Sequence, residues 1–111
     1  MKRANPFTNP GSAERRRKAR VAAGLSRSQA AKEISPTTQS GDVQRWETLD
    51  DSRPALNAEY QRMADAYGVS LDYLEHGTLA CFADVMAEYH DAPEEIRLAV
   101  MKRWSQEHPT E

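Results

Sequence analysis

Leu-Ser-Arg-Ser-Gln-Ala-Ala-Lys-Glu-Ile at residues 25–34 and Asp-Val-Gln-Arg-Trp-Glu at residues 42–47 are the most informative segments of this chain. Ser26 and Gln29 stand in the Ser-x-x-Gln spacing of a capping box, with Leu25 placed to pack ahead of the cap. A helix is therefore predicted to begin just after Ser26. Ala30, Ala31 and Ile34 recur at helical spacing, so they are expected to form its inner face.

A turn is predicted after this helix. Pro36 lacks an amide hydrogen and disfavours helical geometry at the residue before it, so residues 35–40 are expected to form the turn and residues 40–48 the next helix. Val43 and Trp46 are three residues apart and should face the core. Two short helices joined by a turn, the second with small polar residues on its free face, are typical of a helix-turn-helix. This device places side chains in a DNA major groove.

Candidate DNA-contacting residues lie at the start and on the free face of the second helix. An amide can pair bidentately with adenine, and hydroxyl groups can donate or accept hydrogen bonds at base edges. The base-reading candidates are Thr38, Gln39, Ser40 and Gln44. Arg45 is better suited to phosphate. From this helix alone, ordinary solvated side chains on a surface helix remain an equal alternative.

Several short motifs occur in a fixed order across residues 13–76. They are Ala19-Arg20, Gly24-Leu25-Ser26, Ala31, Val43 with Arg45-Trp46-Glu47, and Gly-Val-Ser-Leu-Asp-Tyr-Leu at residues 68–74. Their order and spacing resemble the Cro/repressor-type helix-turn-helix family, also called the XRE family. The resemblance implies an all-α fold, a compact five-helix repressor-like domain whose fourth and fifth helices span residues 57–67 and 70–76. It also implies that Arg27, Ser28, Arg45 and Arg53 contact the DNA backbone or groove edge.

Periodicity supports the fourth and fifth helices independently of the resemblance. The apolar positions Leu56, Tyr60, Met63, Ala64 and Tyr67 fall on one helical face, so they are expected to be core. Gly68 should terminate that helix, and Ser70 should cap the next one.

Four features depart from the family pattern. The turn between the two helices is about two residues longer than usual. Gly41 weakens a helix, and Asp42 would be repelled by phosphate, although it could favour the helix N-terminus or accept from a cytosine amine. Arg16 occupies a position that is typically apolar, which predicts a thin core there that Phe7 could fold back to cover.

The first segment of the chain predicts an arm and a basic helix. Residues 1–11 contain Asn-Pro pairs and are expected to be a flexible basic arm with Lys2 and Arg3. Ser12 offers an N-cap for a helix over residues 13–23. Its inward candidates are Ala19, Ala22 and Ala23, and its basic surface would be formed by Arg15, Arg16, Arg17, Lys18 and Arg20.

Residues 12–77 thus form the expected DNA-binding domain, and residues 78–111 a helical C-terminal extension. Asp91-x-x-Glu94 has capping-box spacing. The apolar sets predicted to face inward are Leu79, Phe82, Ala83, Met86 and His90, then Ile96, Ala99, Val100 and Trp104. These helices could pack on the fourth and fifth helices or exchange across a two-fold axis. Because symmetric dimers are the usual readers of paired half-sites, a homodimer is expected.

Charge divides the chain into a basic and an acidic half. Residues 1–56 hold 11 Lys or Arg against 6 acids, a net charge of +5, whereas residues 57–111 hold 4 against 11, a net charge of −7. This division favours a basic nucleic-acid face backed by an acidic body, although chance clustering of surface charge remains the alternative.

Other classes of function have little support. No apolar run approaches the roughly 18 residues that span a bilayer, and the first residues lack the apolar core of a secretion signal, so a cytoplasmic protein is expected. Cys81 lies in an apolar run and is expected to be buried. His76, His90 and His108 lack ligand spacing, and no catalytic motif is present. The chain is therefore not expected to be an enzyme or to need a cofactor or metal.

The sequence thus predicts a sequence-specific transcriptional regulator that binds double-stranded DNA, a repressor acting as a dimer on a palindromic operator through its third helix. The chief alternative is an antitoxin or another protein-interaction module that binds a protein partner through the C-terminal half. A third possibility is a nonspecific nucleoid-type DNA binder, but the negative net charge of the chain argues against it.

Overall fold

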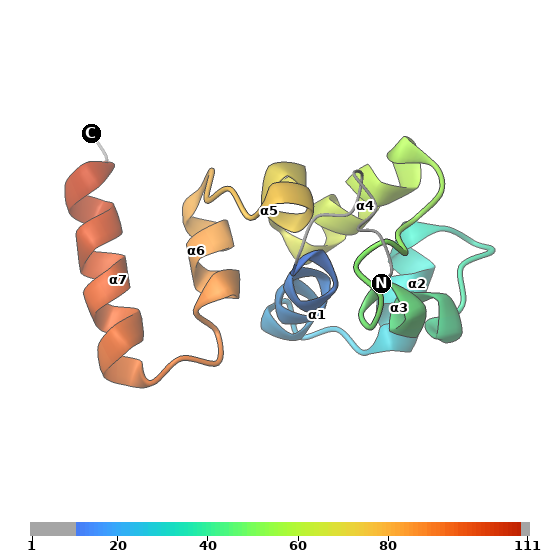
Figure 1. Ribbon diagram of the computed structural model, residues 1–111, viewed down its shortest axis with the longest axis horizontal. Helices are drawn as coiled ribbons and strands as arrows, with labels where there is room; N and C mark the ends of the chain where they lie inside the picture. The colour runs from blue at the N-terminus through green and yellow to red at the C-terminus, as the bar shows by residue number, and fades with distance from the viewer. Residues whose placement is uncertain (1–10, 110–111) are drawn as a thin grey trace, which may run out of the picture.

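A computed structural model describes residues 11–109, and these residues form seven α-helices and no strand (Figure 1). The helices are α1 Ser12–Ala22, α2 Arg27–Ile34, α3 Ser40–Trp46, α4 Asn57–Tyr67, α5 Leu71–His76, α6 Phe82–Glu88 and α7 Glu94–Glu107. The predicted all-α class is therefore confirmed. Within the described residues, none of these helices combines the length and apolar character needed to cross a membrane.

Local capping signals set several helix ends as predicted. The Ser26 hydroxyl accepts from the Gln29 amide at 3.1 Å, and the Gln29 side chain accepts from the Ser26 amide at 2.8 Å, which completes the capping box of α2. Ser70 caps α5 by accepting from the Tyr73 amide at 3.0 Å. Gly68 ends α4 with φ of 72°, a left-handed conformation that glycine adopts without steric cost.

The start of α1 differs from the prediction, because its capping group comes from far along the chain. Ser12 is not the N-cap but the first helical residue, and its hydroxyl donates to the Asp50 carbonyl at 3.0 Å. The Asp50 carboxylate accepts from the amides of Gly11 at 3.2 Å and Ala13 at 3.0 Å. Gly11 is the last residue of the predicted arm, and the rest of that arm, with Lys2, Arg3 and Phe7, lies outside the described residues.

The main core lies among α1 to α5. Its buried members include most of the predicted ones: Ala19, Ala30, Ala31, Ile34, Val43, Trp46, Tyr60, Met63, Ala64 and Tyr67. The predictions for Ala22, Ala23 and Leu56 are wrong, because all three are exposed. The buried face of α1 passes through Ser12, Arg16 and Ala19 and ends there, and Leu56 precedes the first turn of α4.

Arg16 is buried, although it was predicted to belong to a basic surface. Only 1% of the residue is exposed. Its guanidinium donates to the carbonyl oxygen of Trp46 at 2.6 Å and to the hydroxyl of Tyr60 at 2.9 Å. It also donates to the carbonyls of Leu49, Asp50 and Ser52. Arg16 therefore fills the predicted gap in the core with its own side chain and ties α1 to the loop after α3.

Helix α6 packs through a different face from the predicted one, whereas α7 keeps part of its predicted inner face: Val100 and Trp104 are half-buried, but Ile96 and Ala99 are exposed. α6 lies against α1, and its buried residues are Asp84, Val85 and Ala87, whereas Phe82, Ala83 and Met86 are exposed. The Asp84 carboxylate is fully buried, and it accepts hydrogen bonds from Ser70 and from the amides of the two residues before α6. Because this side of α6 faces the protein interior, its most apolar side faces outward.

Two further predictions for this region are wrong. Cys81, expected to be buried, is the exposed N-cap of α6. α7 begins at Glu94 with Pro93 as its N-cap and no side-chain capping bond, so Asp91 and Glu94 do not form the predicted capping box. Asp91 is instead drawn toward α1, where it accepts from Arg17 at 3.1 Å.

Candidate nucleic-acid interface

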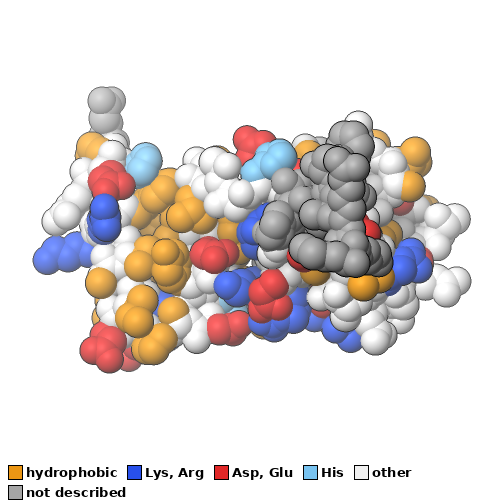
Figure 2. All heavy atoms as spheres, in the orientation of Figure 1, with side chains coloured by type: hydrophobic (Ala, Val, Ile, Leu, Met, Phe, Trp, Pro, Cys, Tyr) orange, Lys and Arg blue, Asp and Glu red, His pale blue; other side chains and the backbone are white. Residues whose placement is uncertain are grey.

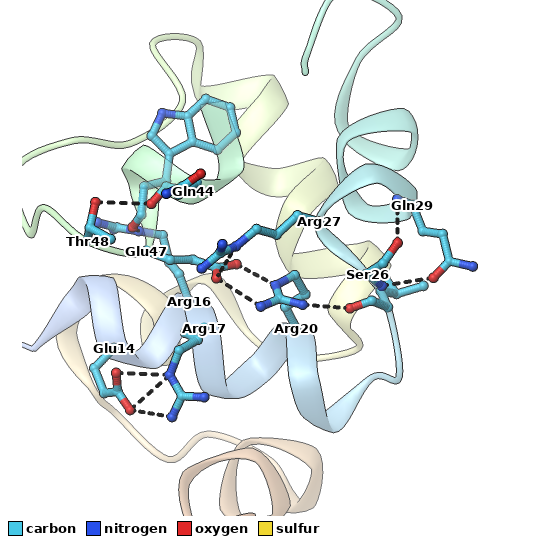
Figure 3. A network of polar contacts seen from close by, with 12 residues as sticks. Glu14, Arg16, Arg17, Arg20, Ser26, Arg27, Gln29, Gln44, Glu47 and Thr48 are labelled. Atoms are coloured by element: carbon cyan, nitrogen blue, oxygen red, sulfur yellow. Dashed lines mark hydrogen bonds and ion pairs between the residues drawn. The ribbon is translucent and has the colours of Figure 1, made fainter. Parts of the chain in front are cut away.

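A buried carboxylate at the C-terminal end of α3 fixes this helix against α1 and α2 (Figure 3). Glu47 has a side chain that is only 1% exposed, and it accepts from Arg20 at 2.5 and 3.0 Å and from Arg27 at 3.3 Å. Arg20 also donates to the Leu25 carbonyl at 2.8 Å. Burial raises the pKa of the nearby Tyr67 hydroxyl, and the Glu47 charge raises it further. One carboxylate thus joins three helices and sets the orientation of α3.

Replacing Glu47 by glutamine is expected to lower the free energy of unfolding by about 2–4 kcal/mol, because two arginines would lose their ionised partner in a buried setting. Urea unfolding followed by circular dichroism measures the change. Glu33→Gln is the matched control, because Glu33 is exposed on α2. Equal unfolding midpoints for the two variants would contradict an anchoring role for Glu47.

The connection between α2 and α3 spans five residues, 35–39, which confirms the prediction of a longer turn than the usual three or four. Ser35 leaves α2 in an extended conformation, and its hydroxyl lies 3.1 Å from that of Thr37. The Thr38 amide donates to the Ser35 carbonyl at 3.2 Å. These local hydrogen bonds give the longer connection a defined shape before α3 begins.

Asp42, which departs from the family pattern, has a structural role at the start of α3. One oxygen of the Asp42 carboxylate accepts from the Gln39 amide at 2.9 Å, and the other accepts from Arg45 at 3.2 Å. The expectation that Asp42 favours the helix N-terminus is therefore confirmed. α3 ends at Trp46, two residues earlier than predicted, where the Thr48 hydroxyl donates to the carbonyl of Gln44 at 3.1 Å.

The candidate base-reading residues lie on and just before this helix. Gln39, Ser40 and Gln44 are exposed, and Thr38 is half-buried. Gly41, one turn before Gln44 and Arg45, faces open space, since a Cβ added there would meet no atom within 4 Å. The free face of α3 therefore presents amide and hydroxyl groups around a position with no side chain.

Each of the three candidate phosphate-binding arginines forms an intramolecular ion pair with an acidic side chain. Arg27 contacts Glu47, and Arg45 contacts Asp42 and, at 3.3 Å, the Ser52 hydroxyl. Arg53 pairs with Glu75 at 2.5 Å, and its guanidinium carbon lies over the Tyr60 ring, 5.9 Å from the centroid. The remaining candidate is the exposed Ser28. Phosphate contacts by these arginines would be shared with, or exchanged for, the intramolecular pairs.

The basic residues of α1 serve the fold. Arg17 pairs with Glu14 at 2.6 Å and with Asp91, and Lys18 pairs with Glu88 at 3.5 Å. The hydrogen bond from Arg17 lowers the pKa of the Glu14 carboxyl. Two of these pairs, Arg17 with Asp91 and Lys18 with Glu88, join cations of the first half to acids of the second. The predicted basic surface on α1 is wrong for the buried Arg16, and two of its other cations hold the C-terminal part of the chain against α1.

Comparison with known protein families, curated proteins and solved structures finds no match to this chain. Within residues 11–109, no group of three or more His, Cys, Asp or Glu side chains is placed to hold a metal ion. The assignment of the site therefore depends on its geometry and on the sequence pattern.

Lys32 is a further candidate that the sequence reasoning missed. It is exposed on α2, four residues after Ser28 and therefore on the same helical face. Within residues 11–109, Lys32 makes no ion pair, in contrast to the three candidate arginines. The spacing of Ser28 and Lys32 on the predicted helix was the signal that could have identified it.

Proposed function

We propose that this protein is a sequence-specific DNA-binding regulator of the Cro/repressor type, which reads bases through α3. The observation that carries the proposal is the exposed polar face of α3 held in place by the buried Glu47. A reading helix must keep its geometry while its free side chains stay available to the major groove. The fixed inner face and open outer face of α3 meet both requirements.

Separate roles follow for the residues around α3. Thr38, Gln39, Ser40 and Gln44 would contact base edges, with Gln44 offering the amide that suits adenine. The backbone contacts would come from Arg27, Ser28, Arg45, Arg53 and the newly identified Lys32. Repression is the proposed direction of control, since a small protein can exclude polymerase by occupying a promoter. Two copies would bind a palindromic operator, each with its own α3.

Selection of bound sequences from a randomised DNA pool tests this proposal, with DNA from upstream of the gene as a second probe. Wild type is expected to enrich a defined site that resists excess nonspecific competitor. Gln44→Ala should weaken binding to that site by about 1–3 kcal/mol and relax the preference at one position. Gln106→Ala, an exposed glutamine on α7, is the control. Weak, sequence-independent binding by wild type would overturn the proposal.

Gly41→Ala separates stability from DNA binding. Alanine at this exposed helical position should raise the free energy of unfolding by about 0.5–1 kcal/mol, because glycine loses more backbone freedom on folding. The added methyl group meets open space in the free protein, but it would project from the free face of α3. We expect a higher melting temperature together with weaker binding to the selected site. Unchanged DNA affinity would argue against a close approach of α3 to DNA.

A protein-interaction function is the second candidate, and the exposed apolar residues of the C-terminal helices favour it. Phe82, Met86, Ile96 and Leu98 are each more than one-third exposed. Figure 2 shows hydrophobic side chains gathered at the end of the molecule formed by α6 and α7. A tight complex with another protein, combined with no enrichment of a DNA site, would favour this function over the regulator.

A further inference from the structure

Helix α7 is the least buried element of the described chain. None of its 14 residues is buried, and α6 is the helix against which it packs. Figure 1 shows α7 at one end of the molecule, away from α2 and α3. A helix of this length gains most of its stability from packing. Because α7 packs on α6 through one face, its other face is available to a partner.

The side chains of α7 divide into two faces. The inner face is turned toward α6, where Val100 and Trp104 line a cleft of about 240 Å³ with Val85 and Tyr89. The outer face consists of residues at positions i, i+3, i+4 and i+7, all of them exposed: Glu95, Leu98, Ala99 and Lys102. Leu98 is 56% exposed at the middle of this outer face.

Charge on the outer face is arranged symmetrically about its centre. Glu95 lies three residues before Leu98, and Lys102 lies three residues after Ala99. Within residues 11–109, neither Glu95 nor Lys102 makes an ion pair, and no residue three or four positions away on α7 carries the opposite charge. The two charges are about 10 Å apart along the helix axis, too far to pair with each other.

We infer that the outer face of α7 is a dimer interface, in which α7 of a second copy lies antiparallel across a two-fold axis between Leu98 and Ala99. This register places Glu95 opposite Lys102 of the partner subunit, and symmetry forms the same pair twice. Leu98 and Ala99 pack at the axis, where the small alanine lets the two helices approach closely. A two-fold interface must complement itself, and the order acid, apolar, apolar, base does so only in the antiparallel arrangement.

The expected dimer is weak and leaves the α3 surface open. Two helices in contact along this face bury less than the roughly 800 Å² per partner of a standard interface, so a dissociation constant on the order of micromolar is expected. Because α3 and α7 lie at different ends of the molecule, pairing through α7 covers neither copy's α3 (Figure 1). The inference deepens the dimeric part of the proposed function and rests on that part alone.

Sedimentation equilibrium of the full chain without DNA tests the interface. Glu95→Lys and Lys102→Glu each place like charges opposite one another twice, so each variant alone should dissociate at about tenfold higher concentration than wild type. An equimolar mixture of the two variants should regain wild-type association, because opposite charges then face each other at both contacts between positions 95 and 102. Mixed dimers of this kind are not expected from a helix pair in another register.

A second pair of variants tests the apolar centre. Leu98→Asp should leave the chain monomeric. Leu56→Asp is the control and should leave association unchanged, because Leu56 is the N-cap of α4 and is 60% exposed. Circular dichroism would establish that both variants remain folded. A monomeric wild type, or a dimer insensitive to Leu98→Asp and to the charge exchange, would overturn the interface. Specific DNA binding is measured separately, so a protein that dimerises without binding DNA would refute the regulator and retain the interface.

Discussion

Replacing Arg16 by methionine is expected to lower the free energy of unfolding by about 3–5 kcal/mol. The variant keeps a long apolar stem but removes a guanidinium that makes five hydrogen bonds, four of them to backbone carbonyls. Buried or partly buried acceptors would then lack a donor, and each such loss costs about 1–3 kcal/mol. Chemical and thermal unfolding followed by circular dichroism would measure the change.

Two controls separate the buried network from the loss of a positive charge. Arg103→Met makes the same chemical change at a side chain that is 82% exposed, so its effect should stay within about 0.5 kcal/mol. Arg16→Lys keeps the charge but loses the planar fork, so an intermediate loss of stability is expected. If Arg16→Met unfolded with the same midpoint as Arg103→Met, the loop after α3 would not depend on this side chain.

Asp84→Ala is expected to lower the free energy of unfolding by about 2–4 kcal/mol and to loosen the C-terminal helices. The carboxylate accepts from the Ser70 amide and hydroxyl, both at 2.7 Å, and from the amides of Ala80 at 2.9 Å and Cys81 at 3.2 Å. It therefore joins the start of α5 to the start of α6. Without it, three backbone amides lose their acceptor.

Hydrogen exchange and urea unfolding together test this role. Amides at the start of α6 should exchange faster in Asp84→Ala than in wild type, in proportion to the lost stability. Asp72→Ala is the control, since Asp72 is exposed in the first turn of α5 and its loss should cost less than about 1 kcal/mol. Wild-type protection of the residues around Ala80 in the Asp84 variant would show that other contacts hold α6 in place.

Sequence reasoning succeeded where the signal and its partner lie within a few residues. The capping box of Ser26 and Gln29, the cap at Ser70 and the glycine that ends α4 were all predicted, because each involves contacts within one helical turn. The inward faces of α2, α3 and most of α4 followed from apolar spacing for the same reason. The candidate residues on α3 could be placed at a helix start, although their binding roles stay predictions.

Sequence reasoning failed for polar residues whose partners are distant in the chain. Asp50 caps α1 from 37 to 39 residues away, and Asp84 turns an apolar face of α6 outward by binding backbone amides. Apolar spacing could not anticipate either arrangement, because an apolar pattern places every charged residue on the surface. The pairing of Arg17 with Asp91 was hidden for the same reason, since only folding brings their charges together.

The amino-acid sequence was thus enough to predict the all-helical class, most helix boundaries of α1 to α5 and the side chains that α3 leaves free, because these depend on backbone preferences and on local spacing. The burial of Arg16, the anchoring of α3 by Glu47 through two arginines and the exposed face of α7 became evident only in the folded chain. Those outcomes depend on backbone carbonyls and distant charges meeting inside a folded chain, where a buried polar group persists only if its partners are already in place.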